Sequence, residues 1–246
     1  MVFNAPVLNY AHLAPILIIL GGAVIGVLIE AFISRAARHN AQLFVSLLSL
    51  VSAFAALMTN RKAASVDAAM QSVAFDGAAF IIQATVLVIA VLAVFLIADQ
   101  ENFTALAAAI PGSQEERESL QKDLRVTEVY PLTLFAVAGM LLFPIATDLI
   151  TLFVALEVLS LPLYLMAGLS RRRRLMSQEA ALKYFLLGAF SSAFFLFGVA
   201  YLYGYSGSIT LSGIQQSVVG GSGNDIFLLL GIAFLSVGLL FKVGAV

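Results

Sequence analysis

The sequence predicts an all-α membrane protein, a polytopic transmembrane bundle of about seven helices. Hydrophobic residues make up 61% of the chain and charged residues only 11%, whereas soluble domains average about 45–50% and about 25%. The apolar residues form seven long runs, each close to the roughly 20 residues that a helix needs to cross a bilayer. A soluble fold could not cover so much apolar surface, so we expect lipid to cover it.

The first three runs cover residues 13–33, 41–58 and 78–98. No positively charged stretch precedes the first run and no small-residue cleavage pattern follows it, so we expect this run to be retained as a helix. It contains Gly22 and Gly26, whose spacing predicts close packing against a neighbouring helix.

Four more runs cover residues 131–146, 149–169, 180–205 and 226–246. Only a short segment ending in Thr147 and Asp148 separates the fourth run from the fifth, which predicts a tight helical hairpin with one of these two residues as the N-cap. The last run carries Lys242 deep inside an apolar stretch, so we expect the chain to be an N-terminal portion of something longer.

Positive residues in the loops predict the orientation. Nine of them follow the first, third and fifth runs, and two lie on the other side. Because positive residues favour the cytoplasmic side, we expect the N-terminus outside and the arginines at 171–174 inside. The nine are Arg35, Arg38, Arg117, Lys122, Arg125 and those four arginines, and the other two are Arg61 and Lys62.

Composition excludes several classes of function. The formal net charge of −1 argues against a nucleic-acid partner. The chain has no cysteine, which excludes disulfides, cysteine-bound zinc and iron–sulfur clusters. The two histidines, His12 and His39, lie far apart in the sequence and predict no metal or haem site. We find no nucleotide, flavin or redox-centre signature, and expect this chain to bind no cofactor.

Charged residues inside the apolar runs are the candidates for function, because a charge at the bilayer centre costs at least about 2.5–3.5 kcal/mol. Glu157 is the strongest of them. It lies roughly 13 Å along a helix from Asp148, which places it near mid-membrane. The alternative is a neutral, structural glutamate bonded to a nearby hydroxyl such as that of Ser160. The full set is Glu30, Asp148, Glu157, Lys183 and Lys242.

Lys242 follows an uninterrupted apolar stretch and is also predicted to lie deep, although a lysine at a helix end can instead extend to the membrane surface. A lone buried carboxylate or ammonium favours its neutral form, and placing the two together restores both charges. A Glu–Lys pair that opens and closes could therefore change its affinity for protons.

The remaining charges have more ordinary alternatives. Lys183 lies about one turn inside the sixth run, and either extends to the surface or takes part in transport. Glu179 is expected in the first turn of that helix, where it would favour the helix dipole. Asp148 is expected to be a cap rather than a proton relay, and Glu30 to reach the surface or to pair with Arg35.

Two stretches carry a family resemblance, residues 148–164 (DLITLFVALEVLSLPLY) and 179–195 (EAALKYFLLGAFSSAFF). Together with EVYPL at 128–132 and LFKVGAV at 240–246, they resemble the antiporter-like subunits of respiratory complex I, and the N subunit of NADH-quinone oxidoreductase in particular. Asp76-Gly77, before the third run, also fits. The resemblance covers roughly residues 75–246.

The resemblance implies a fold of about fourteen helices in two inverted repeats, of which this chain would be the N-terminal half. Residues 1–128 would hold helices one to three and a cytoplasmic loop, and residues 129–246 the first antiporter-like repeat. Glu157, Lys183 and Lys242 would serve proton translocation, with Lys242 on a broken seventh helix. We expect Glu157 and Lys242 to lie within ion-pair or one-water distance of each other.

The resemblance also implies a multi-pass protein of the bacterial cell membrane. Its partners would be lipid, other membrane-arm subunits of complex I and the NADH-oxidising peripheral arm. The complex would use NADH, FMN, iron–sulfur clusters and quinone, all in other subunits. Two alternatives stay open: a large subunit of a multi-subunit cation/proton antiporter, and a membrane scaffold that transports nothing.

Overall fold

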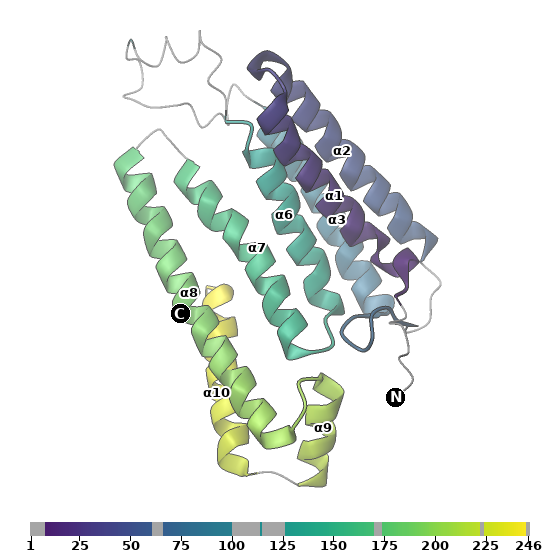
Figure 1. The fold of residues 1–246 in the computed structure, drawn as a ribbon, viewed down its shortest axis with the longest axis vertical. Helices are drawn as coiled ribbons and strands as arrows, with labels where there is room; N and C mark the ends of the chain where they lie inside the picture. The colour runs from purple at the N-terminus through teal and green to yellow at the C-terminus, as the bar shows by residue number, and fades with distance from the viewer. Residues whose placement is uncertain are drawn as a thin grey trace.

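The computed structural model describes residues 8–60, 66–99, 114, 126–169, 174–221 and 224–244. These residues form a bundle of long, roughly aligned helices, as Figure 1 shows. Six of its helices are long and apolar enough to cross a membrane, and a shorter apolar helix lies among them. The predicted fold class, a polytopic helical membrane bundle, is confirmed.

Each of the seven apolar runs contains a helix. The N-terminal helices are α1 (Tyr10–Phe32), α2 (Arg35–Thr59) and α3 (Gly77–Ala98). They are followed by α6 (Val129–Leu142), which continues into the 3-10 turn η1 (Phe143–Ile145), and by α7 (Leu149–Leu169), α8 (Arg174–Ser206) and α10 (Asp225–Lys242). Between α8 and α10 lies the short helix α9 (Leu211–Gly220), which the apolar runs do not predict.

Helix α8 begins at Arg174, six residues before the apolar run that predicts it. Polar residues at the end of a spanning helix can stay helical outside the hydrocarbon, so hydropathy alone places the start too late. Most of the loop residues that predict the orientation lie outside the described residues: Arg61, Lys62, Arg117, Lys122, Arg125 and the arginines at 171–173.

Helices α1, α2, α3 and α6 share one apolar core, in which side chains such as Ile19, Leu50, Leu87 and Leu134 are fully buried. The predicted close packing of α1 is confirmed. A Cβ at Gly22 would lie 2.7 Å from Ser49 Cβ on α2, and one at Gly26 would lie 3.0 Å from Pro131 Cβ on α6. These two glycines therefore let three helices approach closely.

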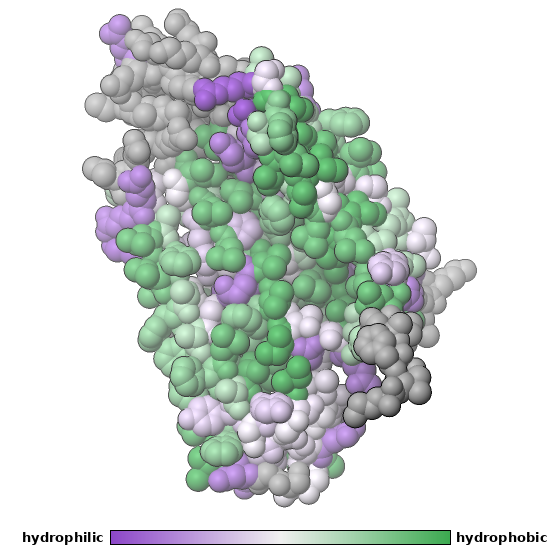
Figure 2. Space-filling model, viewed as in Figure 1, coloured by the Kyte–Doolittle hydropathy of each residue, from purple (hydrophilic) through white to green (hydrophobic). Residues whose placement is uncertain are grey.

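A second, smaller core joins α7, α8 and α10 and includes Leu156, Phe195 and Leu202. Helix α6 connects it to the first core, because α6 packs against α1 and α3 as well as against α7. Gly139 makes this contact close, since a Cβ there would lie 2.8 Å from the Leu159 Cα of α7. Figure 2 shows hydrophobic residues over most of the middle of one face and more hydrophilic residues near its two ends.

A small hairpin and the start of α9 tie the two cores together at one end of the bundle. Strands β1 (Val66–Asp67) and β2 (Ala74–Phe75) pair antiparallel. The Thr147 amide donates to Ser72 O in the hairpin turn at 3.0 Å, and the Leu211 amide donates to Thr147 O at 3.0 Å. The predicted tight turn between the fourth and fifth runs is thus confirmed, and it lies between the hairpin and α9.

Candidate functional site

Helix α10 places a lysine in the middle of the bundle. It begins at the cap Asn224, whose side chain accepts from the Ile226 amide, and ends at Lys242. Gly244 follows with a φ of 69°, a left-handed conformation that turns the chain away from the helix. Figure 1 shows that α10 ends about halfway along α8. Lys242 is therefore at the negative end of the α10 dipole, which favours a cation there.

Helix α7 brings Glu157 to the same level. The Asp148 carboxylate caps this helix by accepting from the amides of Ile150 at 2.9 Å and Thr151 at 2.8 Å, so the expectation of a cap is confirmed. Glu157 follows near the middle of α7. The Asp148 cap fixes where α7 begins, and Glu157 therefore lies near the middle of a helix that is long enough to span a membrane.

Glu157 and Lys242 form an ion pair, with 3.4 Å between Lys242 Nζ and Glu157 Oε1. The predicted approach of the two side chains is confirmed. Their side chains are 24% and 14% exposed, respectively. Because an isolated charge at this depth is costly, each charge offsets part of the free-energy cost of burying the other.

Neutral hydroxyls hold Lys242 more closely than the carboxylate does. Its ammonium donates to Ser160 Oγ at 2.8 Å and to the Tyr164 hydroxyl at 3.2 Å. Both residues are buried and follow Glu157 by three and seven positions, on the same face of α7. An ammonium has three hydrogens to donate, so the three α7 side chains can satisfy it completely.

Helix α8 positions the other half of the site. The Ser192 hydroxyl donates to Glu157 Oε1, the oxygen that also accepts from Lys242. One turn earlier, Gly188 makes room for Tyr164, because a Cβ at Gly188 would overlap the Tyr164 hydroxyl and lie 2.5 Å from its Cζ. The Tyr164 ring also meets the Tyr184 ring edge to face at 4.6 Å.

The geometry of the site would let the ion pair open and close. The ion pair is long, while both of its members have neutral hydrogen-bond partners of their own. If the carboxylate and the ammonium move apart, Ser192 can still donate to Glu157, and Ser160 and Tyr164 can still accept from Lys242. The pair can therefore open without leaving either charged group unsolvated.

The sequence did not single out Tyr164 and Ser192. Tyr164 could have been found because it shares the α7 face of Glu157, seven residues away. The sequence suggests Ser160 as a partner of Glu157, but Ser160 bonds to Lys242, and Ser192 donates to the carboxylate instead. No sequence signal identifies Ser192, since its contact depends on how α8 is rotated against α7.

The structure does not bring Lys183 to the ion pair. Its side chain is 69% exposed on α8 and pairs with Glu179 Oε1 at 2.5 Å, one turn away. The expectation that Glu179 lies in the first turn is wrong, because α8 begins five residues earlier. A part for Lys183 in proton translocation stays a prediction.

Glu30 pairs with Arg38 at 3.4 Å, so the pairing with Arg35, one of the two alternatives for Glu30, is wrong. Arg35 is the first residue of α2 and is exposed, whereas Arg38 lies one turn further along and reaches back to α1. Within the described ranges, no three histidine, aspartate or glutamate side chains lie close enough together to hold a metal ion.

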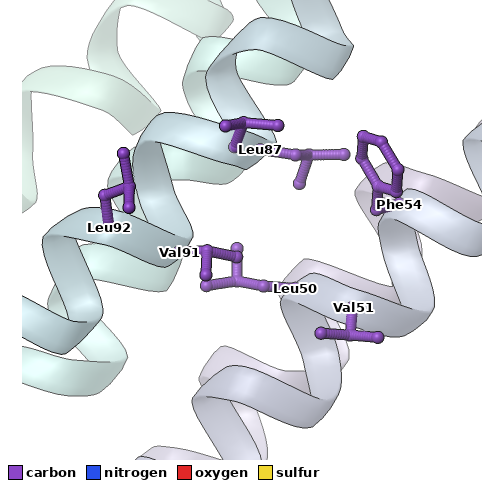
Figure 3. A pocket seen from close by; sticks show the side chains of 7 residues that line it. Leu50, Val51, Phe54, Leu87, Val91 and Leu92 are labelled. Carbon is purple, nitrogen blue, oxygen red and sulfur yellow. The ribbon is translucent and has the colours of Figure 1, made fainter.

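An apolar groove of about 220 Å³ lies between α2 and α3, shown in Figure 3. Its lining includes Leu50 and Phe54 from α2, and Leu87 and Leu92 from α3. None of its seven lining residues carries a polar side chain that could hold a proton or an ion. The ion pair of α7 and α10 is therefore the stronger candidate for function.

Comparison with known proteins shows the family to which the chain is similar. A family model described as "NADH:quinone oxidoreductase/Mrp antiporter, TM" matches residues 146–246, which include Glu157, Ser192 and Lys242. NADH-quinone oxidoreductase subunit N of Rhodococcus opacus is 50% identical, in an alignment that covers 98% of this chain and 49% of that protein. The chain is a relative of NADH-quinone oxidoreductase subunit N. The predicted resemblance is confirmed, and the chain spans about half the length of the curated subunit N proteins it matches.

Solved structures show the same fold. Respiratory complex I from Thermus thermophilus contains a chain with a TM-score of 0.66 and 31% identity, in an alignment that covers 92% of this chain and 43% of that one. An archaeal membrane-bound sulfane sulfur reductase contains a chain with a TM-score of 0.64 and 22% identity, in an alignment that covers 94% of this chain and 44% of that one. The second likeness concerns the fold alone. This relative of subunit N is a multi-pass membrane protein.

Proposed function

We propose that this chain is a proton-translocating part of the membrane arm of an NADH-quinone oxidoreductase. The observation that carries the proposal is the ion pair between Glu157 and Lys242, which lies at mid-bundle with a hydroxyl partner for each charge. Relatives named NADH-quinone oxidoreductase subunit N, which are about 50% identical in sequence, support the assignment to this complex. Electrons would move in other subunits, and this chain would respond to them only through its charges.

The proposed step is a proton transfer on Lys242. With the pair closed, Glu157 stabilises the ammonium form of Lys242. When the pair opens, the ammonium loses its counter-charge and releases a proton along a hydrated path, leaving a neutral amine. Closing the pair favours uptake of the next proton. Moving one charge against the membrane potential takes about 2.3 kcal/mol per 100 mV, which is within the range of such electrostatic changes.

Further parts of the proposal concern organisation. Residues 129–246 would form the first antiporter-like repeat, and residues 1–128 would precede it with three helices and a cytoplasmic loop. The N-terminus would lie outside the cell, as the loop charges predict. Lys183 would be a further proton-carrying residue. Its side chain is exposed on α8, where a neighbouring subunit could contact it.

The proposed partners are the other membrane-arm subunits of complex I, its peripheral NADH-oxidising arm and lipid. NADH, FMN, iron–sulfur clusters and quinone would serve the complex in those other subunits. Buried glycines such as Gly22 and Gly198 show how this chain packs its own helices, and the exposed apolar side chains of α8 leave surface for such neighbours.

The test uses the assembled complex in inverted membrane vesicles. Glu157→Gln removes the negative charge with little change of shape, and should impair NADH-driven proton uptake while assembly on native gels survives. Glu157→Asp keeps the charge and should retain more activity than Glu157→Gln. Equal activity of the two variants at the wild-type level would contradict a role for the charge.

A cation/proton antiporter subunit is the second candidate. It is favoured by the family model, whose description covers both NADH:quinone oxidoreductase and Mrp antiporter proteins. Both kinds of protein could use a pair of buried charges of opposite sign. Sodium-driven proton movement in vesicles without NADH would support the antiporter, and proton movement that requires NADH would support the complex I subunit.

A further inference from the structure

A second group of polar side chains lies far from the ion pair, inside the N-terminal core. Gln42, Ser46 and Ser49 follow one another at helical spacing along one face of α2, and all three are buried. This face packs against α1, where Gly22 and Gly26 bring the two helices together. Three polar side chains in an otherwise apolar core need hydrogen-bond partners.

The Gln42 amide group is only half satisfied. Its Nε2 donates to Gly26 O at 2.8 Å and to Glu30 Oε1 at 2.7 Å, so both of its hydrogens are used. These two acceptors also fix which end of the amide is nitrogen. The Gln42 Oε1 then points elsewhere, and it finds no hydrogen-bond donor among the residues that the structure describes.

Ser46 is in the same condition one turn further along α2. Its Oγ is buried and has no hydrogen-bond partner in the described part of the chain. Other hydroxyls in these helices donate to the carbonyl four residues before them, as Ser52 does to Leu48 O at 2.6 Å. Residues four apart on a helix are neighbours on its surface, so these two unsatisfied groups of α2 lie on the same face.

The surroundings of Gln42 Oε1 explain why no described protein group donates to it. A Cβ at Gly26 would lie 3.0 Å from both Gln42 Oε1 and Pro131 Cβ, so this oxygen is next to the place where α1 and α6 approach. Glycine offers no side chain there, and proline has no backbone N–H to donate. A water molecule can donate to Gln42 Oε1 and exchange a hydrogen bond with Ser46 Oγ.

We propose that Gln42 and Ser46 bind a water molecule at the junction of α1, α2 and α6. The chemistry of the site selects water over an ion. Arg38 and Glu30 form an ion pair next to Gln42. The Arg38 guanidinium disfavours a bound cation there, and the Glu30 carboxylate disfavours a bound anion.

The bound water would continue a polar chain from the end of α1 into the bundle. Exposure falls along this chain, from 24% and 15% for the Arg38 and Glu30 side chains to 0% for Gln42 and 1% for Ser46. The chain therefore begins at the edge of the bundle, near the turn between α1 and α2. It does not depend on the proposed transport function.

The first test compares Ser46→Ala with Ser52→Ala in the full-length chain in its native membrane. Heated membranes are assayed for the temperature at which the chain aggregates. If Ser46 is bound to water, Ser46→Ala removes a partner of that water and lowers the midpoint by more than Ser52→Ala does. If the hydroxyl is dry, its removal relieves an unsatisfied group, and an unchanged or raised midpoint overturns the proposal.

The second test distinguishes water from a bond within the protein. A density map of the assembled complex that resolves buried water molecules should show one within hydrogen-bond distance of both Gln42 Oε1 and Ser46 Oγ. A Ser46 hydroxyl bonded to the Gln42 backbone carbonyl instead, with no water beside Gln42 Oε1, would overturn the proposal even if Ser46→Ala is destabilising.

Discussion

Replacing Gly188 by alanine should disturb the ion pair from a neighbouring helix. Gly188 touches neither Glu157 nor Lys242, but the added Cβ would overlap the Tyr164 hydroxyl and lie 2.5 Å from Tyr164 Cζ. Tyr164 cannot move freely, because Tyr184 and Phe185 lie against its ring at centroid distances of 4.6 and 5.9 Å. We therefore expect Tyr164 to shift and to release the ammonium of Lys242.

The magnitudes decide the direction of the effect. Alanine favours a helix over glycine by about 0.5–1 kcal/mol. Overpacking of a filled site costs about 1–3 kcal/mol, and a lost hydrogen bond to a charged group costs about 1.5–3 kcal/mol. The losses exceed the gain, so we expect Gly188→Ala to be destabilising by roughly 2–4 kcal/mol.

Gly204 provides the matched control on the same helix. A Cβ there would lie 3.6 Å from Phe227 Cδ2, an ordinary contact. The assay is the aggregation temperature of the chain in heated membranes, together with NADH-driven proton uptake. Gly188→Ala should lower both, and Gly204→Ala should lower neither. Tyr164→Phe should lower the aggregation temperature less in the Gly188→Ala background than in the wild type, because Gly188→Ala has already broken the hydrogen bond between Lys242 and Tyr164. Equal behaviour of the two glycine variants would refute this reasoning.

Three shorter predictions follow from other contacts. Ser192→Ala removes the neutral partner of the Glu157 carboxylate and should slow NADH-driven proton uptake, with assembly on native gels retained. Arg38→Met leaves Glu30 without its cation and should reduce the amount of assembled chain, whereas Arg35→Met, at an exposed position, should not. A cysteine placed at position 172 should react only from the cytoplasmic side, and labelling from outside intact cells would reverse the proposed orientation.

Hydropathy predicts the six long helices and the shorter α6 because burial in lipid requires continuous apolar runs. It does not predict α9, which is too short to span a membrane and lies between α8 and α10 at one end of the bundle. It also places the start of α8 at residue 180 rather than at Arg174, since the residues before the apolar run are mostly polar but still helical.

The sequence likewise predicts some residues of the site and not others. The cost of buried charge identifies Glu157 and Lys242 from the sequence. Their pairing is expected from their opposite signs together with the neighbouring helices that the family resemblance implies. The partners Tyr164 and Ser192 depend on how α7, α8 and α10 are rotated against one another, which hydropathy does not encode. The same reason explains why Arg38, rather than the nearer Arg35, meets Glu30.

The central claim is that Glu157 and Lys242 act as an openable pair in proton translocation. The most direct measurement is NADH-driven proton uptake by inverted vesicles that contain a fully assembled complex with Glu157→Gln and Lys242→Met together. Both side chains keep roughly their size, so packing is preserved while both charges are lost. Uptake should fall well below the wild-type level at equal assembly. Wild-type uptake by this double variant would show that the pair is structural and would favour a scaffold.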